Sequence, residues 1–243
     1  MSRRLVQLDA NRCEFPSPTQ ALRDPNGLLA VGGDLSVKRL LAAYSSGIFP
    51  WFDDDLGPIL WWSPDPRAVL LPHELHVSRS LQRRLRSGGF SVTLDRAFAA
   101  VMQGCAAPRA GSTGTWITAR MRRAYQRLYR AGYAHSIEVW QQDELVGGLY
   151  GVSLGRMFFG ESMFSRAPDA SKVALVALLW QIERWGFTLL DCQVMNPHLR
   201  SLGAREIPRS EFLERLAQSN RQPTRKGVWQ MDEDGSWHAG RTG

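Results

Sequence analysis

The chain has 243 residues and a formal charge of +7 at pH 7, which is enough length for one large domain or two modest ones with a full core. Its basic residues are 27 arginines and only three lysines. Arginine binds phosphate through paired hydrogen bonds and stacks on flat rings, so this balance favours nucleic acid as a partner. A GC-rich genome would explain the arginines equally well. The three cysteines form no Cys-x-x-Cys pair, which argues against a disulfide scaffold or a thiolate zinc site.

No targeting or membrane segment is visible. The start, Met1-Ser2-Arg3-Arg4-Leu5, lacks an apolar signal core, and no apolar run approaches the length of a membrane span. His73 and His76 are three residues apart without further ligands, so we interpret them as surface histidines and expect no metal. We therefore expect a cytoplasmic protein that does not contact a membrane.

Residues 1–68 predict a small N-terminal α/β domain rich in turns and aromatic rings. Gly32-Gly33 is not followed by the lysine and hydroxyl of a phosphate loop, so it predicts a tight turn before a helix over about 37–45, capped by Ser36. Prolines in the aromatic segments 48–52 and 61–67 predict irregular loops. Most of these rings should fill a core, and one or two should be platforms on which bases stack.

The domain boundary is expected at residue 68, and two basic helices should follow, over 78–86 and 119–131. Thr118 should cap the second helix. At 100° per residue, four arginines of the second helix share an arc of about 80°. A charged stripe of this kind is usually a solvated face, but a stripe without acids also suits phosphates. The four are Arg120, Arg123, Arg127 and Arg130.

The remaining pattern predicts one α/β unit, residues 69–217. Strands are expected over 135–141, 144–150, 156–160 and 188–194, with a buried helix over 171–185 and a last short helix that ends with residues 213–217. Strand, helix, strand implies a parallel pair with a right-handed crossover, in a sheet otherwise built from hairpins. The fold class is therefore α+β: a small N-terminal domain and a mixed sheet flanked by helices. The polar residues 218–243 should form a flexible tail.

A candidate site lies where two of these strands end. In the sequence, Glu161 is flanked by the apolar residues Phe158, Met163 and Phe164. Period-two alternation along a strand places Asp191 and Gln193 on one face. If the strands are neighbours, the three polar side chains gather beside an apolar wall. This suits a ligand that is half apolar and half charged. A solvated strand face explains the same spacing about equally well.

The crossover unit resembles the N-acyltransferase fold, and the ordered motifs resemble the bacterial leucyl/phenylalanyl-tRNA–protein transferases over about residues 5–217. In coenzyme-A-using members of that fold, glycines at the helix N-terminus cradle the pyrophosphate. Residues 165–172 contain none, which argues against coenzyme A. The motifs that carry the family resemblance are Gly32-Gly33-Asp34-Leu35-Ser36, Gly47-Ile48-Phe49-Pro50-Trp51-Phe52, Trp61-Trp62-Ser63-Pro64-Asp65-Pro66-Arg67, Gly114-Thr115-Trp116-Ile117-Thr118, His135-Ser136-Ile137-Glu138-Val139-Trp140, Gly160-Glu161-Ser162-Met163-Phe164-Ser165 and Asp191-Cys192-Gln193.

The resemblance implies transfer of Leu, Phe or Met from aminoacyl-tRNA to proteins that begin with Arg or Lys, which marks them for degradation by the N-degron route. It implies a monomer without cofactor. An aminoacyl ester is already activated, so the enzyme must only hold it beside an amine, remove a proton and stabilise an oxyanion. Asp191 would position the acceptor α-amine and take its proton, and Gln193 would orient the carbonyl. Glu161 would hold the donor amine or the basic acceptor side chain.

The resemblance also implies two binding regions. Tyr44, Trp51, Trp116 and Tyr125 would surround the terminal adenosine, and the four arginines would follow the acceptor stem. The family commonly has methionine where this chain has Leu149, and a smaller residue at Phe159. Two other functions remain open: a coenzyme-A-dependent N-acetyltransferase of the same fold, and a non-catalytic tRNA-binding module. The donor side-chain pocket, whose residues could equally be plain core, would comprise Leu149, Phe158, Gly160, Met163, Phe164 and Leu190.

Overall fold

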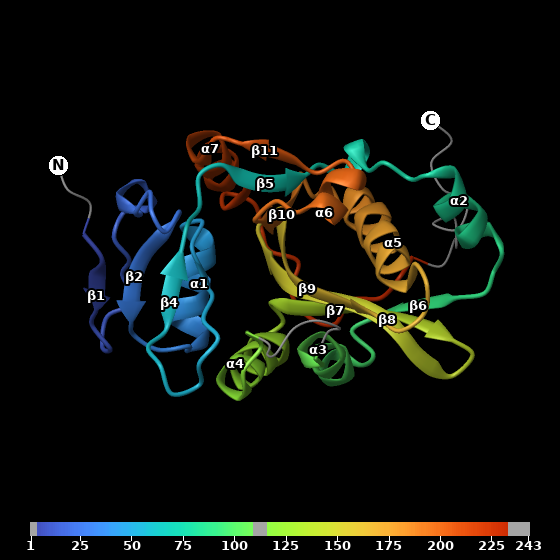
Figure 1. The fold of residues 1–243 in the computed structure, drawn as a ribbon, viewed down its shortest axis with the longest axis horizontal. Coiled ribbons are helices and arrows are strands. Elements are labelled where there is room, and N and C mark those ends of the chain that lie inside the picture. The colour runs from blue at the N-terminus through green and yellow to red at the C-terminus, as the bar shows by residue number, and fades with distance from the viewer. Residues whose placement is uncertain (1–3, 109–115, 233–243) are drawn as a thin grey trace.

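The computed structural model describes residues 4–108 and 116–232, which form two sheets with helices around them (Figure 1). The first sheet has the strand order β1-β2-β4-β3 and makes the N-terminal domain. Beside it lies α1 (Val37–Ser45), which Ser36 caps by accepting a hydrogen bond from the Arg39 backbone, as the sequence predicted. The other elements of this domain are β1 (Val6–Leu8), the 3₁₀ turn Pro18–Gln20, β2 (Leu28–Gly32), β3 (Phe49–Pro50) and β4 (Leu60–Trp62).

The second sheet has seven strands in the order β11-β5-β10-β9-β8-β7-β6. Its one parallel pair among the described residues, β9 with β10, is joined by α5 (Ala170–Arg184), so the predicted crossover is confirmed. The predicted α+β class with a mixed sheet flanked by helices is confirmed with it. The strands are β5 (Arg67–Leu70), β6 (Ser91–Leu94), β7 (Ala134–Gln141), β8 (Glu144–Leu154), β9 (Met157–Ser165), β10 (Leu189–Gln193) and β11 (Arg205–Ile207).

Helices cover both faces of this sheet (Figure 1). On one face lies α5, with α2 (Arg79–Arg86), the 3₁₀ turn Pro72–Glu74 and α6 (Pro197–Ser201) near it. On the other lie α3 (Phe98–Ala106) and α4 (Ala119–Arg130), the latter capped by Thr118 as predicted. Neither α3 nor β6 was predicted from the sequence. For α3 the signal was present, since four of its buried residues recur at helical spacing: Phe98, Val101, Met102 and Cys105.

The prediction of a flexible tail from residue 218 is wrong for its described part. The last helix, α7 (Arg209–Ser219), ends two residues later than predicted, and the chain then runs beside the start of β7, where the Gly227 N–H donates to the Gly132 carbonyl at 3.3 Å. The ring of Trp229 is 1% exposed and stacks on His135 at 3.6 Å, while its backbone N–H donates to Asp95 at 2.7 Å. Burial of the large Trp229 ring stabilises this segment although most of its residues are polar. The mean polarity of the segment therefore did not reveal that it is ordered. Residues 233–243 lie outside the described structure.

None of the described helices is long and apolar enough to cross a membrane.

Candidate functional site

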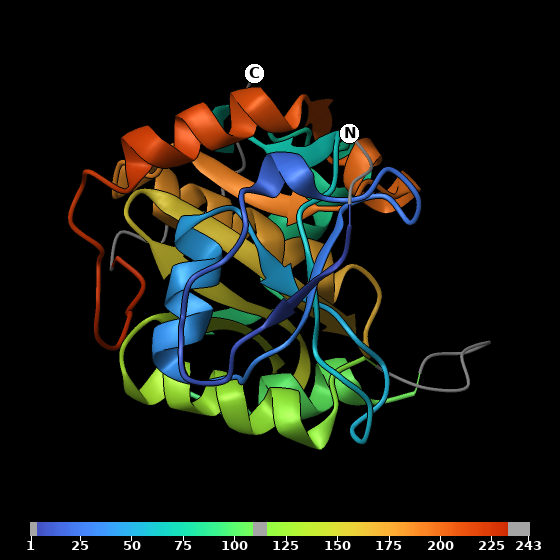
Figure 2. The ribbon, with the colours of Figure 1, turned by 90° about the vertical axis from the view of Figure 1, so that its left-hand side faces the viewer.

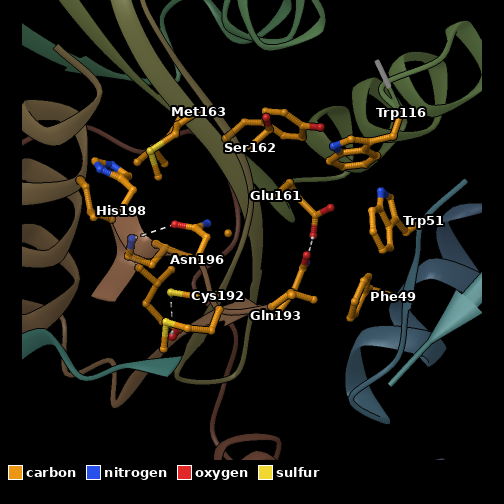
Figure 3. Close-up of a pocket in the computed structure, with 18 of the residues that line it drawn as sticks. Phe49, Trp51, Trp116, Glu161, Ser162, Met163, Cys192, Gln193, Asn196 and His198 are labelled. Carbon is orange, nitrogen blue, oxygen red and sulfur yellow. Dashed lines mark hydrogen bonds between the residues drawn. The ribbon is translucent and has the colours of Figure 1, made fainter. Parts of the chain in front are cut away.

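A cavity of about 560 Å³ opens where the N-terminal domain meets the second sheet, on the side covered by α5 and α6. Figure 3 shows its polar centre, Glu161 and Gln193, between two walls of different chemistry. Trp51 and Trp116 lie on one side of this pair, and Met163 and His198 lie on the other. The arrangement can hold a flat ring on one side and an apolar side chain on the other.

Glu161 accepts hydrogen bonds from three side chains on three different elements. Oε1 accepts from Tyr44 of α1 at 2.7 Å and from Gln193 of β10 at 3.0 Å, and Oε2 accepts from Tyr125 of α4 at 2.7 Å. Burial raises the pKa of Glu161 to about 7, against the lowering effect of the tyrosine hydrogen bonds; the charge of nearby Asp191 also raises it. A carboxyl with this pKa can gain or lose a proton near neutral pH.

The prediction that Asp191 and Gln193 share one face of their strand is wrong. The register of β10 against β5 shifts between them, and Gln193 has φ 63°. This bulge breaks the period-two alternation and turns Gln193, with Cys192, toward the cavity. The backbone N–H of Gln193 donates to Asp191 Oδ1 at 2.9 Å, so the carboxylate of Asp191 supports the bulge.

Asp191 does not reach the cavity. Its side chain is 0% exposed and forms a two-pronged ion pair with Arg67, Nε to Oδ1 at 2.8 Å and Nη2 to Oδ2 at 2.6 Å. The guanidinium of Arg67 lies between the rings of Phe49 and Phe212, at 4.8 and 4.6 Å from their centroids. A buried carboxylate needs a cationic or hydrogen-bonding partner, and Arg67 supplies it within the protein. The expectation that Asp191 takes the acceptor's proton does not fit this placement, because the carboxylate is buried against Arg67 and the backbone of Gln193.

The aromatic wall contains half of the predicted adenosine-binding set. Trp51 is 44% exposed, and both it and Trp116 line the cavity. Tyr44 and Tyr125 are 0% exposed and lie behind Glu161, so the prediction that they contact the adenosine is corrected. Gly114 and Thr115, which precede Trp116 in its motif, lie outside the described residues.

The apolar wall contains four of the six residues predicted for the donor pocket: Leu149, Gly160, Met163 and Leu190 line the cavity. Phe158 and Phe164 do not, and their assignment is corrected. Phe158 is fully buried beside Trp229. Phe164 lies on the other face of the sheet, in the core that contains α3. Phe159 packs on Tyr44 and is also absent from the wall, so the family difference at 159 does not shape the cavity directly.

The arginine stripe of α4 is divided between two roles. Arg120 donates to the backbone carbonyls of Asp55 and Gly57 at 3.0 and 2.9 Å, and Arg127 donates to that of Leu35 at 3.1 Å. These two arginines fasten α4 to the N-terminal domain, beneath which it runs in Figure 2. The prediction that all four face RNA is therefore corrected. Arg127 remains exposed despite this bond, as are Arg123 and Arg130, for which no hydrogen bond to the N-terminal domain is seen among the described residues.

The comparisons with known proteins agree with the motifs. Residues 69–217 match the sequence profile described as leucyl/phenylalanyl-tRNA protein transferase, and residues 33–65 match the profile of its N-terminal domain. A leucyl/phenylalanyl-tRNA–protein transferase of Thiobacillus denitrificans is 61% identical over 222 residues, which cover 91% of this chain and 97% of the relative. The chain belongs to the leucyl/phenylalanyl-tRNA–protein transferase family. It is an enzyme of the aminoacyltransferase class.

Further relatives carry the same family name. One from Stutzerimonas stutzeri is 60% identical over 213 residues, 88% of this chain and 94% of the relative. One from Pseudomonas syringae pv. syringae is 54% identical over 237 residues, 98% of this chain and 99% of the relative. Among solved structures, a GCN5-related N-acetyltransferase of Kribbella flavida overlaps at a TM-score of 0.38 and 11% identity, over 68% of this chain and 59% of that one. The family assignment rests on the sequence relatives, and this partial overlap adds nothing to it.

Sequence reasoning about this transferase family missed part of the site. Arg67 begins an otherwise apolar strand, and an arginine in that position indicates a buried partner, which was the signal for the Asp191 ion pair. Leu175 and Leu178 of α5 complete the apolar wall, and their spacing of three along an apolar helix was the available signal. Asn196 and His198 join the wall from the turn that begins α6, for which the pattern gave no signal. Within the described residues, no group of three or more His, Cys, Asp or Glu is placed to hold a metal ion.

Proposed function

We propose that this enzyme transfers Leu, Phe or Met from aminoacyl-tRNA to the N-terminal α-amine of proteins that begin with Arg or Lys, and so marks them for degradation. The observation that carries the proposal is the cavity itself, which places the Glu161–Gln193 pair between an aromatic wall and an apolar wall. An aminoacyl-adenosine end has the same three parts in the same order: base, ester and side chain. We place the reaction in the cytoplasm and the enzyme as a monomer.

The terminal adenosine would stack between Trp51 and Trp116, and the donor side chain would enter the wall formed by Leu149, Met163 and Leu190. The ester then lies over the polar pair. Both ends of the substrate are held, so the ester carbonyl is oriented before the amine arrives. Such a wall separates donor side chains only modestly, because one methylene is worth ~1–3 kcal/mol.

Gln193 and Glu161 would divide the chemistry between them. The amide nitrogen Nε2 of Gln193 carries two protons and gives one to Glu161 at 3.0 Å. The second can be donated to the ester carbonyl oxygen as it becomes an oxyanion. Glu161, with a pKa of about 7, would take the proton of the acceptor amine as the C–N bond forms. The proton would then pass to the ribose 3′-oxygen as its bond to the carbonyl carbon breaks.

Transfer to defined peptides tests this function. The enzyme is incubated with tRNA charged with radiolabelled leucine and with peptides that begin with Arg, Lys or Asp. We expect label on the Arg and Lys peptides and none on the Asp peptide or on an N-acetylated Arg peptide. Acetyl-CoA in place of charged tRNA should leave all peptides unmodified. Acetylation of the peptide, or tRNA binding without any transfer, would establish one of the two competing functions instead.

The aromatic wall should determine affinity for the 3′ end. We expect Trp51→Ala and Trp116→Ala each to weaken binding of a stable leucyl-adenosine analogue by about 5- to 150-fold, since stacking is worth ~1–3 kcal/mol per base. Isothermal titration calorimetry measures the affinity. Trp180→Ala is the matched control, because Trp180 lies on α5, away from the cavity, and packs on Arg184. Unchanged affinity in both wall variants would place the adenosine elsewhere.

The exposed arginines of α4 should bind phosphates of the RNA. Replacing Arg123 and Arg130 together by alanine should flatten the slope of log affinity against log salt by about 0.7–0.9 for each phosphate that is no longer neutralised. The double variant Arg184→Ala and Arg215→Ala removes the same charge from other surfaces, where both side chains pair with acids. Equal slopes in the two double variants would show that Arg123 and Arg130 are only solvated and do not contact the RNA. The RNA would then bind another basic surface, such as that of α2.

A further inference from the structure

The contacts of Glu161 with Tyr44 and Tyr125 form a closed ring of oxygen atoms. Each tyrosine hydroxyl lies 2.7 Å from one of the two carboxyl oxygens, and the two hydroxyls are hydrogen-bonded to each other. The tyrosines are 0% exposed and Glu161 is 9% exposed, so bulk water does not complete any of the three contacts. Within the described residues, neither hydroxyl forms a hydrogen bond outside the ring.

A count of protons distinguishes the two charge states of this ring. Each of the three oxygen–oxygen contacts needs one proton to be a hydrogen bond. With Glu161 ionised, the two hydroxyls supply two protons, and one contact brings lone pairs together in a buried site. With Glu161 protonated there are three protons for three contacts, and each hydroxyl donates once and accepts once. The ring is therefore complete only when it holds one extra proton.

We propose that Tyr44 and Tyr125 are positioning residues that make Glu161 a proton store, and that the ring closes when Glu161 takes the proton of the acceptor amine. This inference rests on the proposed transfer reaction. The amine nitrogen forms a bond to the ester carbonyl carbon, and its N–H proton moves to Glu161. The bond from that carbon to the ribose 3′-oxygen then breaks, and the ring returns the proton to that oxygen. The ring ends as it began, and no co-reactant is consumed.

Of the other groups that face Glu161, Asp191 favours the protonated state and Gln193 favours the ionised one. Asp191 of β10 is an anion on the neighbouring strand, although Arg67 of β5 pairs with it at 2.6 Å. Tyr150 of β8 is fully buried nearby, and its hydroxyl has no hydrogen-bond partner among the described residues. Gln193 donates to Oε1 in either charge state. No cation other than the paired Arg67 is placed to hold Glu161 ionised within the described structure.

Titration of Glu161 by NMR tests the ring without reference to activity. Protein labelled with ¹³C at the glutamate carboxyls is titrated, and the Glu161 signal is assigned by its loss in Glu161→Gln. Tyr125→Phe removes two of three hydrogen bonds from the protonated ring but only one of two from the ionised ring. Each tyrosine that donates to the ionised carboxylate by itself lowers the pKa of Glu161, whereas the closed ring stabilises the protonated form. We expect the ring effect to prevail, so that the pKa of Glu161 falls in Tyr125→Phe by up to about one pH unit. Tyr44→Phe breaks the same ring from α1 and should lower the pKa similarly.

Tyr129→Phe is the matched control. It removes a hydroxyl from the same helix, where Tyr129 donates to the Asp95 carbonyl at 2.8 Å, and it should leave the Glu161 pKa unchanged. A Glu161 pKa that stays or rises in both ring variants would overturn the proposal, because the hydroxyls would then act only as donors to a permanent carboxylate. The acid limb of the transfer rate should move with the NMR pKa. Should the enzyme fail to transfer leucine at all, the titration still decides the ring separately from the function.

Discussion

Replacing Glu161 by glutamine should lower the single-turnover rate of transfer by about 10²–10⁴, the range for losing a positioned acid–base group. The amide keeps the size of the carboxyl but cannot accept the amine's proton. Binding of the leucyl-adenosine analogue should change little, since the two walls are untouched. Rapid-quench transfer from charged tRNA to an Arg peptide measures the rate.

Glu138→Gln is the matched control for this experiment. Glu138 is also a fully buried glutamate of the same sheet, and it accepts hydrogen bonds from the Ser136 and Thr93 hydroxyls. It does not line the cavity, so the folded variant should retain a rate close to that of the unaltered enzyme. A Glu161→Gln rate within a few-fold of the unaltered enzyme would contradict the assigned role of Glu161.

Replacing Asp191 by asparagine should act first on stability. The guanidinium of Arg67, 1% exposed, would lose its charged partner, and removing one member of a buried ion pair costs about 3–5 kcal/mol. The asparagine side chain can still accept the hydrogen bond from the Gln193 backbone N–H. The transfer rate of the folded Asp191→Asn protein should therefore fall less than that of Glu161→Gln. Urea unfolding measures the free energy of unfolding, and transfer assays well below the midpoint measure the rate.

The double variant Arg67→Met and Asp191→Leu separates the ion pair from the site. Replacing a buried pair by apolar residues of similar volume is often neutral for stability, so the double variant should regain much of the loss. It should not regain activity, because the double variant removes the Asp191 carboxylate. The backbone N–H of Gln193, in the bulge, donates to that carboxylate at 2.9 Å. A loss of less than about 1 kcal/mol in Asp191→Asn would be typical of an exposed pair and would contradict the buried one.

Local patterns predicted much of the fold. The cap at Ser36 defined the start of α1, because a cap acts within one helical turn. The apolar helix between two apolar strands predicted the β9–α5–β10 crossover, because parallel neighbours need such a connection. Elements without a distinct boundary residue, such as α3, were missed: its cap position, Ala97, has no side-chain hydrogen bond.

The site was predicted in composition but not in arrangement. A bulge leaves no trace in the hydrophobic pattern, so period two misplaced Gln193 relative to Asp191. The partners of the two carboxylates are remote in sequence: Arg67 is 124 residues from Asp191, and Tyr44 is 117 residues from Glu161. Local spacing carries no information on contacts of this range. Of the four aromatic residues predicted to contact the adenosine, the two tryptophans line the cavity and the two tyrosines are buried behind Glu161.

The pH dependence of single-turnover transfer, with saturating charged tRNA and limiting Arg peptide, tests the central role of Glu161 most directly. Two groups must lose a proton before the amine attacks: Glu161, with a pKa of about 7, and the peptide α-amine, with an ordinary pKa of about 7.7–8.0. Below both values each group costs about tenfold in rate per pH unit. Log rate should then rise with a slope of about two in the unaltered enzyme and about one in Glu161→Gln. A slope of about one in both would contradict the account and leave the amine as the sole titrating group.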